Sequence, residues 1–378
     1  MSGPARHRTP AGTDAASREP VPDLVLDLRM QAIEAAANQA LLAPSVHNTQ
    51  PWLLVLHRDR IEVLADRRQQ LTAIDPLGRE LVLSVGAALF NLRVALAARG
   101  WAVEVDRLPR PDDADLLAVV RPVAGEVDPL LVGLDPIIAQ RRTNRRRLAA
   151  DDVPDDVVQR LVSIAADEDT ELVPVQREHH RGLVARLTQQ ADALQNADAA
   201  SRAELKRWTM RPLQDAHGIP VPAVRHVDGQ VDLTAGAGQA LLLLSTRSDD
   251  LAAWLRCGET LEHLLLELTR LGWLVSPMTQ VLEVPVTRAA VRSALAGDAH
   301  PQVLLRIGHA EEFAASPRRP RSDVVRVGGP LVPPSPERRT TPVAWPPGPS
   351  GGHGRRVQAG GIPAHRAVSA GRGGTTWI

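Results

Sequence analysis

The sequence predicts an α+β fold in which two diverged copies of one structural unit stand in tandem. The first observation is the stretch Leu81–Ala98, which is apolar nearly all round, as in a buried helix. The second is that a similar stretch returns in the second part of the chain. The third is that a strand candidate precedes and follows each stretch. Two copies of one unit explain this repetition most economically.

The repeat rests on seven identities that fall at one constant offset without gaps. Those of the first copy are Leu83, Gly86, Leu89, Leu92, Leu96, Gly100 and Trp101, and those of the second are Leu255, Gly258, Leu261, Leu264, Leu268, Gly272 and Trp273. Leucines recur by chance along a helix stripe, so the glycines and the two Gly-Trp endings carry more weight. The strand candidates are Leu53–Leu56 and Leu116–Val120 in the first copy, and Ala240–Leu244 and Val303–Ile307 in the second.

Other local patterns complete the first copy. Asp23–Leu42 reads as a helix, and Gly100 follows the buried helix as a plausible C-terminal stop. Leu53–Leu56 and Ile61–Leu64 flank four polar residues, which predicts a β-hairpin.

The charge balance argues against a nucleic-acid binder that works through bulk charge. Lys+Arg and Asp+Glu both number 44 in 378 residues, so the formal net charge is zero. Lys206 is the only lysine. Any anion site in this chain must therefore be built from arginines or from backbone N–H groups.

Cysteine usage and hydropathy predict a cytoplasmic protein. Cys257 is the only cysteine, so no intrachain disulfide is possible; because it falls within the second buried helix, we expect it in the core. No apolar run is expected to span a membrane, and residues 1–20 lack the apolar region of a secretory signal. His179-His180 lies in a charged stretch and is interpreted as solvated rather than as a metal site.

A polar loop separates the first helix from the first strand. Pro44 and Pro51 punctuate it, and Ser45, His47, Asn48, Thr49 and Gln50 lie between them. Short polar side chains of this kind bond either to their own backbone or to a ligand. The residue pattern alone leaves both interpretations open.

A basic run opens the second copy. Arg141-Arg142-Thr143-Asn144-Arg145-Arg146-Arg147 follows the apolar residues 136–139. One interpretation is an anion site; the other is a solvated basic face or a nucleic-acid patch, which lacks interleaved aromatic residues here. The first copy has no such run, and in the second copy Ala165–Val175 occupies the place of the polar loop.

These two motifs together resemble those of the nitroreductase-like flavoproteins. Residues 44–52 resemble the family's Pro-Ser-x-x-Asn-x-Gln-Pro-Trp loop, and residues 141–145 resemble its Arg-Arg-Ser/Thr-x-Arg motif. The complementary loss of one motif in each half resembles the tandem Acg-type subfamily of actinobacterial NAD(P)H nitroreductases. The resemblance covers Leu24–Val325 and includes Asp75–Leu81, Arg207-Trp208, Ser276–Gln280 and Pro317–Pro320.

The resemblance implies a nitroreductase-like fold whose two halves mimic the family's homodimer, with FMN bound in one complete site. One chain then suffices for one flavin, and further dimerisation stays open. The implied cofactor-binding residues are Pro44, Ser45, His47, Asn48, Gln50, Arg141, Arg142, Thr143, Arg145, Pro277, Met278, Thr279, Arg318 and Arg319. For His47, hydrogen bonding to the flavin ring and capping of the loop are equal alternatives. No catalytic side chain and no metal ligand is assigned, because the flavin carries the chemistry.

The implied activity is transfer of hydride from NADH or NADPH to flavin N5 and then to a nitroaromatic or quinone-like acceptor. Relatives often place a lysine beside the ring, so an arginine or a helix N-terminus must substitute here. The alternative is a protein that binds and sequesters FMN without turnover. A third and weaker hypothesis is an Arg-rich interaction protein that uses residues 141–147 and the C-terminal tail.

We expect four segments in the chain: a disordered leader at 1–22, a first half at 23–135, a second half at 136–327 that contains an insert at 198–240, and a disordered tail at 328–378. The tail is rich in Pro, Gly and Arg and has no apolar period. The insert reads as mostly irregular and, by the resemblance, as a lid over the flavin.

Overall fold

The computed structural model describes residues 23–143, 148, 152–209, 218, 240–309 and 316–328. Its contacts separate Met1–Gly348 from Pro349–Ile378, and all of the described residues belong to the first unit. The expected leader, nearly all of the expected tail, and Arg145 lie outside the described residues.

The first sheet is built mainly from the N-terminal part of the chain. Its elements are α1 (Asp23–Ala40), β1 (Trp52–Leu56), β2 (Ile61–Ala65), α2 (Arg79–Ala97), β3 (Ala102–Arg107) and β4 (Leu116–Val123). The strand order is β3-β4-β2-β1-β9, in which β9 (Val325–Val327) returns from the far end of the chain and pairs in parallel with β1. The predicted helix at 23–42, the hairpin, the buried helix and the strand at 116–120 are therefore present.

The second sheet has the order β5-β6-β8-β7. Its strands and main helices are α4 (Asp155–Asp167), β5 (Glu171–Pro174), β6 (Ala240–Thr246), α7 (Leu251–Arg270), β7 (Leu274–Met278) and β8 (His300–Gly308). The remaining described helices are η1 (Val46–Asn48), η2 (Arg67–Gln69), α3 (Pro129–Ile138), α5 (Glu178–Ala197), α6 (Ala199–Trp208), α8 (Gln280–Glu283), α9 (Pro285–Val291), η4 (Arg292–Ala296) and α10 (Arg321–Val324).

The two sheets share one topology. The order β3-β4-β2-β1 in one matches β7-β8-β6-β5 in the other, and all of these neighbours are antiparallel. In each, the long buried helix connects the matching strands, β2 to β3 through α2 and β6 to β7 through α7. Two copies of one unit would have this arrangement. One expected match is corrected: β6 takes the place of β2 and not that of Leu53–Leu56.

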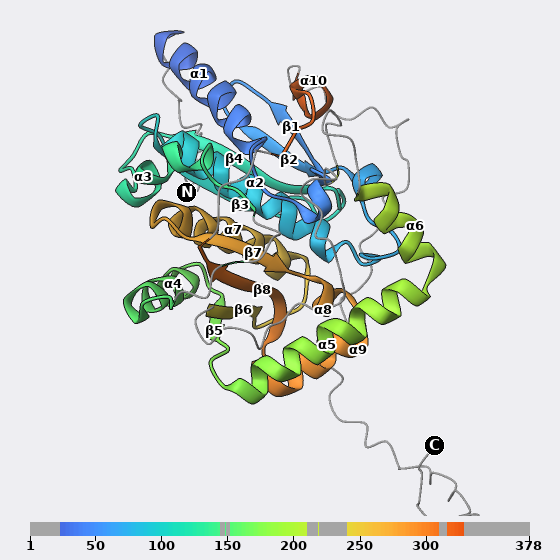
Figure 1. The fold of residues 1–378 in the computed structure, drawn as a ribbon. Helices are drawn as coiled ribbons and strands as arrows, with labels where there is room; N and C mark the ends of the chain where they lie inside the picture. Colours follow the sequence, from blue (N-terminus) through green and yellow to red (C-terminus); the bar gives the residue numbers. More distant parts are fainter. Residues whose placement is uncertain are drawn as a thin grey trace, which may run out of the picture. The chain divides into compact units, whose positions relative to one another are not determined.

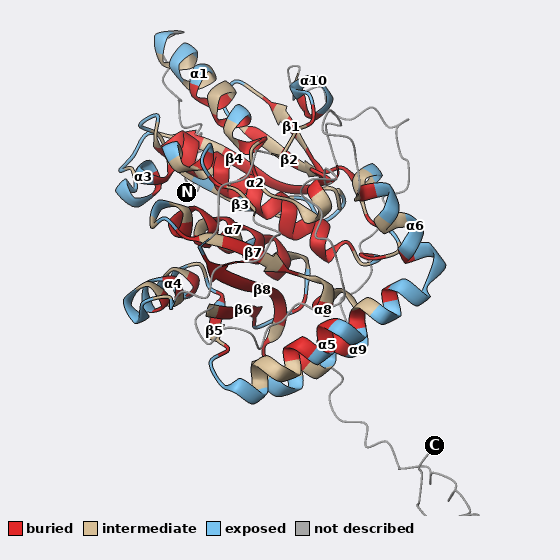
Figure 2. Ribbon diagram, viewed as in Figure 1, coloured by how far each residue is buried: buried red, intermediate tan, exposed pale blue. Residues whose placement is uncertain are grey.

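The helices α2 and α7 pack against each other between the two sheets (Figure 1). They touch at Gly86 and Gly258, where a side chain on either residue would collide with the backbone of the other helix. Nearly every residue of α2 is buried (Figure 2). Among the described helices, α2 alone is long and apolar enough to span a membrane, contrary to the expectation from the sequence, and 94% of that window is buried in the protein.

The sheets differ in how they are covered. In β1 and β2, buried and half-buried residues alternate, since the main apolar core packs on one face. In β6, Leu241–Leu244 are buried without alternation. The reason is that α4 and α7 cover one face of this sheet and α5, α8 and α9 contribute to an apolar cluster on the other.

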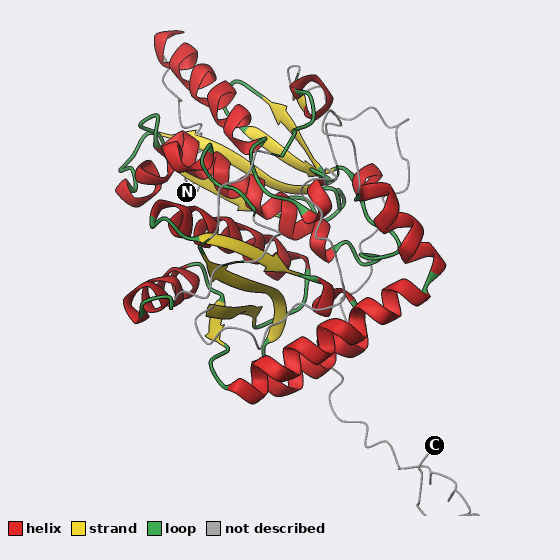
Figure 3. Cartoon of the chain, in the orientation of Figure 1, coloured by secondary structure: helices red, strands yellow, loops and turns green. Residues whose placement is uncertain are grey.

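The expected irregular insert begins with a helix. Figure 3 shows α5 and α6 as successive helices, and β6 begins at Ala240. Asp198 caps α6 by accepting a hydrogen bond from the Ser201 N–H at 2.7 Å, which explains the break between the helices. Residues 210–217 and 219–239 lie outside the described part of the chain.

Candidate cofactor site

The polar loop before β1 has three residues in an unfavourable backbone conformation. His47, Asn48 and Gln50 have φ values of 44°, 56° and 52°, a region that non-glycine residues rarely adopt. Two hydroxyl groups fix the turn: Ser45 Oγ accepts from the Gln50 N–H at 2.9 Å, and Ser84 Oγ accepts from the Val46 N–H at 3.0 Å. Backbone conformations of this type are concentrated at binding sites, where the surrounding structure holds them in place.

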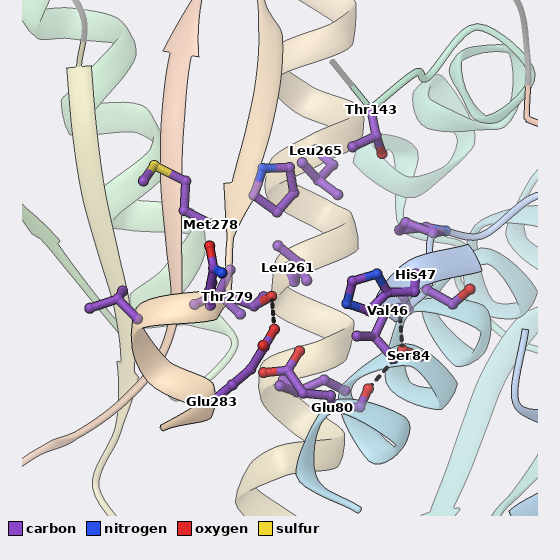
Figure 4. Close-up of a pocket in the computed structure, with 18 of the residues that line it drawn as sticks. Val46, His47, Glu80, Ser84, Thr143, Leu261, Leu265, Met278, Thr279 and Glu283 are labelled. Atoms are coloured by element: carbon purple, nitrogen blue, oxygen red, sulfur yellow. Dashed lines mark hydrogen bonds between the residues drawn. The ribbon is translucent and has the colours of Figure 1, made fainter. Parts of the chain in front are cut away.

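Two cavities adjoin this loop and share Pro44, Ser45 and Thr143 in their walls. The first has a volume of about 270 Å³ and the second about 280 Å³. The first lies between the two halves of the chain and is mostly apolar (Figure 4). The second is lined by three arginines, Arg141, Arg142 and Arg318.

Backbone carbonyls, an amide oxygen and a hydroxyl group position the arginines of the second cavity. Arg318 Nη2 donates to the Leu42 carbonyl at 3.0 Å, and Arg318 Nη1 donates to Asn48 Oδ1 at 3.3 Å. Arg141 Nη1 donates to Thr143 Oγ1 at 3.2 Å, and Arg142 Nη1 to the Ala139 carbonyl at 2.7 Å. Guanidinium groups gathered in this way have the charge and the donor geometry that a multiply charged oxyanion such as a phosphate requires.

A buried carboxyl lies behind the second cavity. Glu262 on α7 is fully buried, and its Oε1 lies 3.6 Å from Arg141 Nε. Burial raises the pKa of Glu262 to about 7, although Arg141, the side chain of Asn91 and Arg318 act in the opposite direction. Burial likewise lowers the pKa of Arg141, and Glu262 opposes that change.

The first cavity is walled by segments from both halves and by the two helices α5 and α6. Its lining includes Leu83, Ser84 and Ala87 of α2, Leu261 and Leu265 of α7, Pro277, Met278 and Thr279 at the end of β7, and Thr188, Gln195, Leu205 and Thr209. Figure 4 shows His47 and Ser84 on one side of the cavity and Met278 and Thr279 on the other. An apolar slot with polar atoms at its edges suits a flat heteroaromatic ring.

One end of the first cavity is acidic. Glu283 accepts hydrogen bonds from Thr279 Oγ1 at 2.6 Å and from Gln195 Nε2 at 2.7 Å. Glu80 pairs with the buried Arg79. Burial, with Glu283 and Asp75 nearby, raises the pKa of Glu80 to about 8, and Arg79 opposes the rise.

The two cavities bring together most of the residues that the sequence singled out. Pro44, Ser45 and Thr143 line both; His47, Pro277, Met278 and Thr279 line the first; Asn48, Arg141, Arg142 and Arg318 line the second. Gln50 and Arg319 line neither. Instead, the Arg319 N–H donates to Gln50 Oε1 at 2.7 Å, and Arg319 Nη2 lies 3.2 Å from Asp66 Oδ2. These two residues join the C-terminal segment to the loop.

Sequence reasoning missed the acidic residues of the site. Glu80 follows Arg79 at the start of an otherwise apolar helix, and this charged pair was a usable signal. No lysine or arginine stands among the described residues that line the first cavity. Of the two substitutes expected beside the ring, an arginine or a helix N-terminus, the arginine is therefore not found in the described wall.

The place related to this site by the repeat is filled with charged side chains. The repeat offset relates three residues of the cavity wall to charged residues of the other half: Ala87 to Glu259, Leu265 to Arg93 and Thr279 to Arg107. Arg93 Nη1 lies 2.9 Å from Glu259 Oε2, and Arg107 Nε lies 2.6 Å from Glu259 Oε1. Glu168 joins the network, 3.2 Å from Arg93 and 3.4 Å from His263. Ion pairs occupy the position where a second cavity would lie.

Three other residues that the sequence singled out lie away from the two cavities. Cys257 is fully buried in α7, and burial raises the pKa of its thiol. The rings of His179 and His180 lie edge to face on α5 with centroids 4.1 Å apart.

Comparison with known proteins finds a family profile and relatives that match this chain. The profile of the nitroreductase family matches residues 138–309. Over 318 residues the chain is 33% identical to "Putative NAD(P)H nitroreductase Rv3131" of Mycobacterium tuberculosis (strain ATCC 25618 / H37Rv), covering 78% of this chain and 91% of that protein. From the same organism, "Putative NAD(P)H nitroreductase acg" is 31% identical over 320 residues, covering 78% of this chain and 95% of that protein.

Two solved structures also align with part of the chain. A nitroreductase with bound FMN from Desulfitobacterium hafniense aligns at 13% identity with a TM-score of 0.37, covering 52% of this chain and 98% of that one. The FMN-dependent nitroreductase NfnB from Mycobacterium smegmatis in complex with NADPH aligns at 17% identity with a TM-score of 0.35, covering 52% and 97%. The mycobacterial sequence relatives, which match over more than nine-tenths of their own length, establish that this chain belongs to the nitroreductase family.

Proposed function

We propose that this chain binds one FMN and is an NAD(P)H-dependent oxidoreductase of the nitroreductase type. The observation that carries the proposal is the pair of adjoining cavities, one lined by three arginines and one mostly apolar. FMN has the same two parts, a phosphate and a flat ring, joined by a polar ribityl chain. The shared wall of Pro44, Ser45 and Thr143 lies where such a chain would pass.

The residues of this chain fit the two ends of the cofactor. Arg141, Arg142 and Arg318 would hold the phosphate, with the hydroxyl of Thr143 as a further hydrogen-bond partner. The apolar wall of the first cavity would hold the ring. Bound FMN supplies hydride chemistry at N5, which passes electrons from NADH or NADPH to an acceptor such as a nitroaromatic or a quinone.

The relatives support the nicotinamide cofactor and the reaction class. Proteins that cover most of this chain carry the name NAD(P)H nitroreductase. Reduced nicotinamide cofactors and a single free cysteine both fit the cytoplasmic location that the sequence predicts. The two homologous sheets and the ion pairs at the repeat-related place support one flavin for each chain.

A second candidate function is sequestration of FMN without turnover, and the attachment of α6 favours it. Glu204 of α6 accepts hydrogen bonds from the Ala73 N–H at 3.0 Å and the Ile74 N–H at 2.9 Å. Trp208 packs with Leu71 and Ile74. These contacts tie the helix to the first half beside the ring cavity, where it would restrict the approach of a nicotinamide.

A visible absorption spectrum of the full chain, before and after anaerobic addition of NADH or NADPH, tests both candidates. Flavin bands that bleach are expected of the oxidoreductase. Bands that persist with either nucleotide, yet bleach with dithionite, would favour sequestration. If no bands appear even after incubation with FMN and gel filtration, the cofactor assignment itself is wrong.

A further inference from the structure

We propose that Glu262 is the positioning residue of the anion cavity: it holds Arg141 in the free protein and takes up a proton when a phosphate-bearing ligand binds. This inference rests on the proposed FMN site, because it assigns the phosphate to the cavity of Arg141, Arg142 and Arg318.

The geometry places Glu262 against the back of Arg141. Both side chains are buried, Glu262 completely and Arg141 with 4% exposed. The Nε of Arg141 lies 3.6 Å from Glu262 Oε1, while its Nη1 donates to the hydroxyl of Thr143 in the cavity wall. One guanidinium thus faces a carboxyl on one side and the anion cavity on the other.

Packing of the helix does not call for an acid at this position. The repeat offset relates Glu262 of α7 to Phe90 of α2, and both are fully buried. A phenylalanine fills the equivalent position without charge. Since an ionised carboxyl is expensive to remove from water, its presence behind an anion site points to a role in that site.

The charged and polar groups that face Glu262 come from three segments. Arg141 lies in the loop after α3, with Arg142 beside it; Arg318 lies in the segment before α10; and Asn91 lies on α2. In the free protein these groups and burial together leave the pKa of Glu262 at about 7. The carboxyl is therefore close to half-protonated at neutral pH.

A bound phosphate changes this balance. Above pH 6 its charge is close to −2, and it competes with Glu262 for the positive charge of Arg141. Negative charge added near a buried carboxylate favours the protonated form. At pH 8, free Glu262 is about one-tenth protonated, so a rise of its pKa by about two units on binding takes up roughly 0.8 proton. The affinity for FMN then falls by up to about tenfold per pH unit between the two pKa values.

The experiment is isothermal titration of the full apo chain with FMN at pH 8, in two phosphate-free buffers of different ionisation enthalpy. The dependence of the observed heat on the buffer gives the number of protons taken up. We expect uptake near 0.8 proton for the wild type at pH 8. At pH 6, where Glu262 is already protonated, uptake should disappear or turn into release from the phosphate. This comparison needs no variant.

Glu262→Gln should abolish the uptake at pH 8 and bind FMN about tenfold more tightly there, because the amide mimics the protonated carboxyl. Glu267→Gln is the matched control: Glu267 is a buried acid on the same helix that pairs with Arg160 and Arg270. It should keep the wild-type uptake.

The outcomes separate the two proposals. FMN that binds to the wild type with no proton uptake at pH 8 would overturn the role of Glu262 and leave the cofactor assignment intact. Uptake that persists in Glu262→Gln would assign the proton to another group and would also overturn it. Failure of FMN to bind the wild type at all would overturn the proposed function and, with it, this inference.

Discussion

Gly86 and Gly258 face each other where α2 crosses α7. A Cβ built on Gly86 would lie 2.2 Å from the carbonyl oxygen of Leu255 and 2.8 Å from the Cα of Gly258. A Cβ built on Gly258 would lie 2.1 Å from the carbonyl oxygen of Leu83 and 2.9 Å from the Cα of Gly86. The contacts are reciprocal, and the repeat relates each partner to the other. Equivalent positions of the two halves therefore meet as they would on a two-fold axis between subunits.

Replacing either glycine should destabilise the protein by separating the two helices. For Gly86→Ala and Gly258→Ala we expect a loss of about 1–3 kcal/mol or more, since the methyl group overlaps rigid backbone. Urea unfolding followed by circular dichroism measures the change. Gly133→Ala on α3 is the control, because nothing lies within 4 Å of its added methyl group. Equal stability of Gly86→Ala and the wild type would contradict the close contact.

Removing one arginine of the anion cavity should weaken FMN binding. Charge-assisted hydrogen bonds contribute about 1.5–3 kcal/mol, so Arg142→Ala should raise the dissociation constant roughly 10- to 150-fold. Quenching of flavin fluorescence gives the constant. Riboflavin, which lacks the phosphate, should show little change with the same variant. The control is Arg247→Ala, which removes an exposed arginine paired with Asp169. An unchanged constant for Arg142→Ala would remove the phosphate assignment.

One chain should bind one flavin. The ion pairs of Arg93 and Arg107 with Glu259 occupy the repeat-related place and leave the second site without an apolar wall. The ratio of flavin absorbance to protein, measured after gel filtration with saturating FMN, should approach 1:1. The mass of the complex in solution, from light scattering, then tells whether a single chain suffices. A ratio near 2:1 would show that the charged cluster still accommodates a flavin.

The stability of the free protein should fall as the pH rises from about 4.5 to about 8. The pKa values of Asp75, Glu262 and Glu80 are raised by burial to about 6, 7 and 8, so the folded state holds protons that the unfolded state has lost. The free energy of unfolding then decreases with pH across this window. Glu80→Gln should flatten the alkaline part of the curve in urea titrations. A curve that is flat from pH 5 to 8 in the wild type would contradict the buried protons.

The same relation predicts a loss of stability in acid from a different group of residues. Hydrogen bonds and charge from His263 and Arg93 hold the pKa of Glu168 at about 2, against the effect of its burial, and Arg288 lowers that of Asp249. Their contributions are present above the ordinary carboxyl pKa and disappear as the pH falls through the lowered values. Glu168→Gln should therefore reduce the acid sensitivity seen in urea titrations between pH 4.5 and 2. An unchanged acid limb would contradict this assignment.

The sequence predicted the elements that depend on local pattern. The buried helix at Leu81–Ala98, the hairpin at 53–64 and the second copy each have a hydrophobic period and flanking turn residues. Both features can be recognised within a single sequence. The strands β3 and β7 were missed, because Ala102–Arg107 alternates over only a few residues and has no fully buried position, and Leu274–Met278 contains a proline. Both pair at a sheet edge, where neighbouring strands supply the order.

Among the residues of the proposed cofactor site, the sequence singled out those whose motif stands in one stretch, as in residues 44–48 and 141–143. Arg319 has the right charge for a phosphate, but the partner that binds it, Asp66, is distant in the sequence. Glu80, Glu262 and Glu283 gain their surroundings only when α2, α7 and the end of β7 converge. A pattern of residue types contains no distance between helices, so apart from the Arg79-Glu80 pair at the start of α2 these carboxyls had no signal of their own.

Loosening α6 should open the ring cavity. Glu204 is the residue to change, because its carboxylate accepts from two backbone N–H groups of the first half. Glu204→Ala removes both charge-assisted bonds, which contribute about 1.5–3 kcal/mol each. We expect FMN to dissociate at least roughly tenfold faster in stopped-flow dilution. If α6 also restricts the nicotinamide, anaerobic reduction by NADPH should accelerate in the same variant. Glu178→Ala on the exposed first turn of α5 is the control for the loss of a helix carboxylate. If the rate of FMN dissociation is unchanged in Glu204→Ala, α6 does not close the site. If dissociation is faster but reduction by NADPH is not, the step that limits reduction lies in the flavin pocket itself and not in α6.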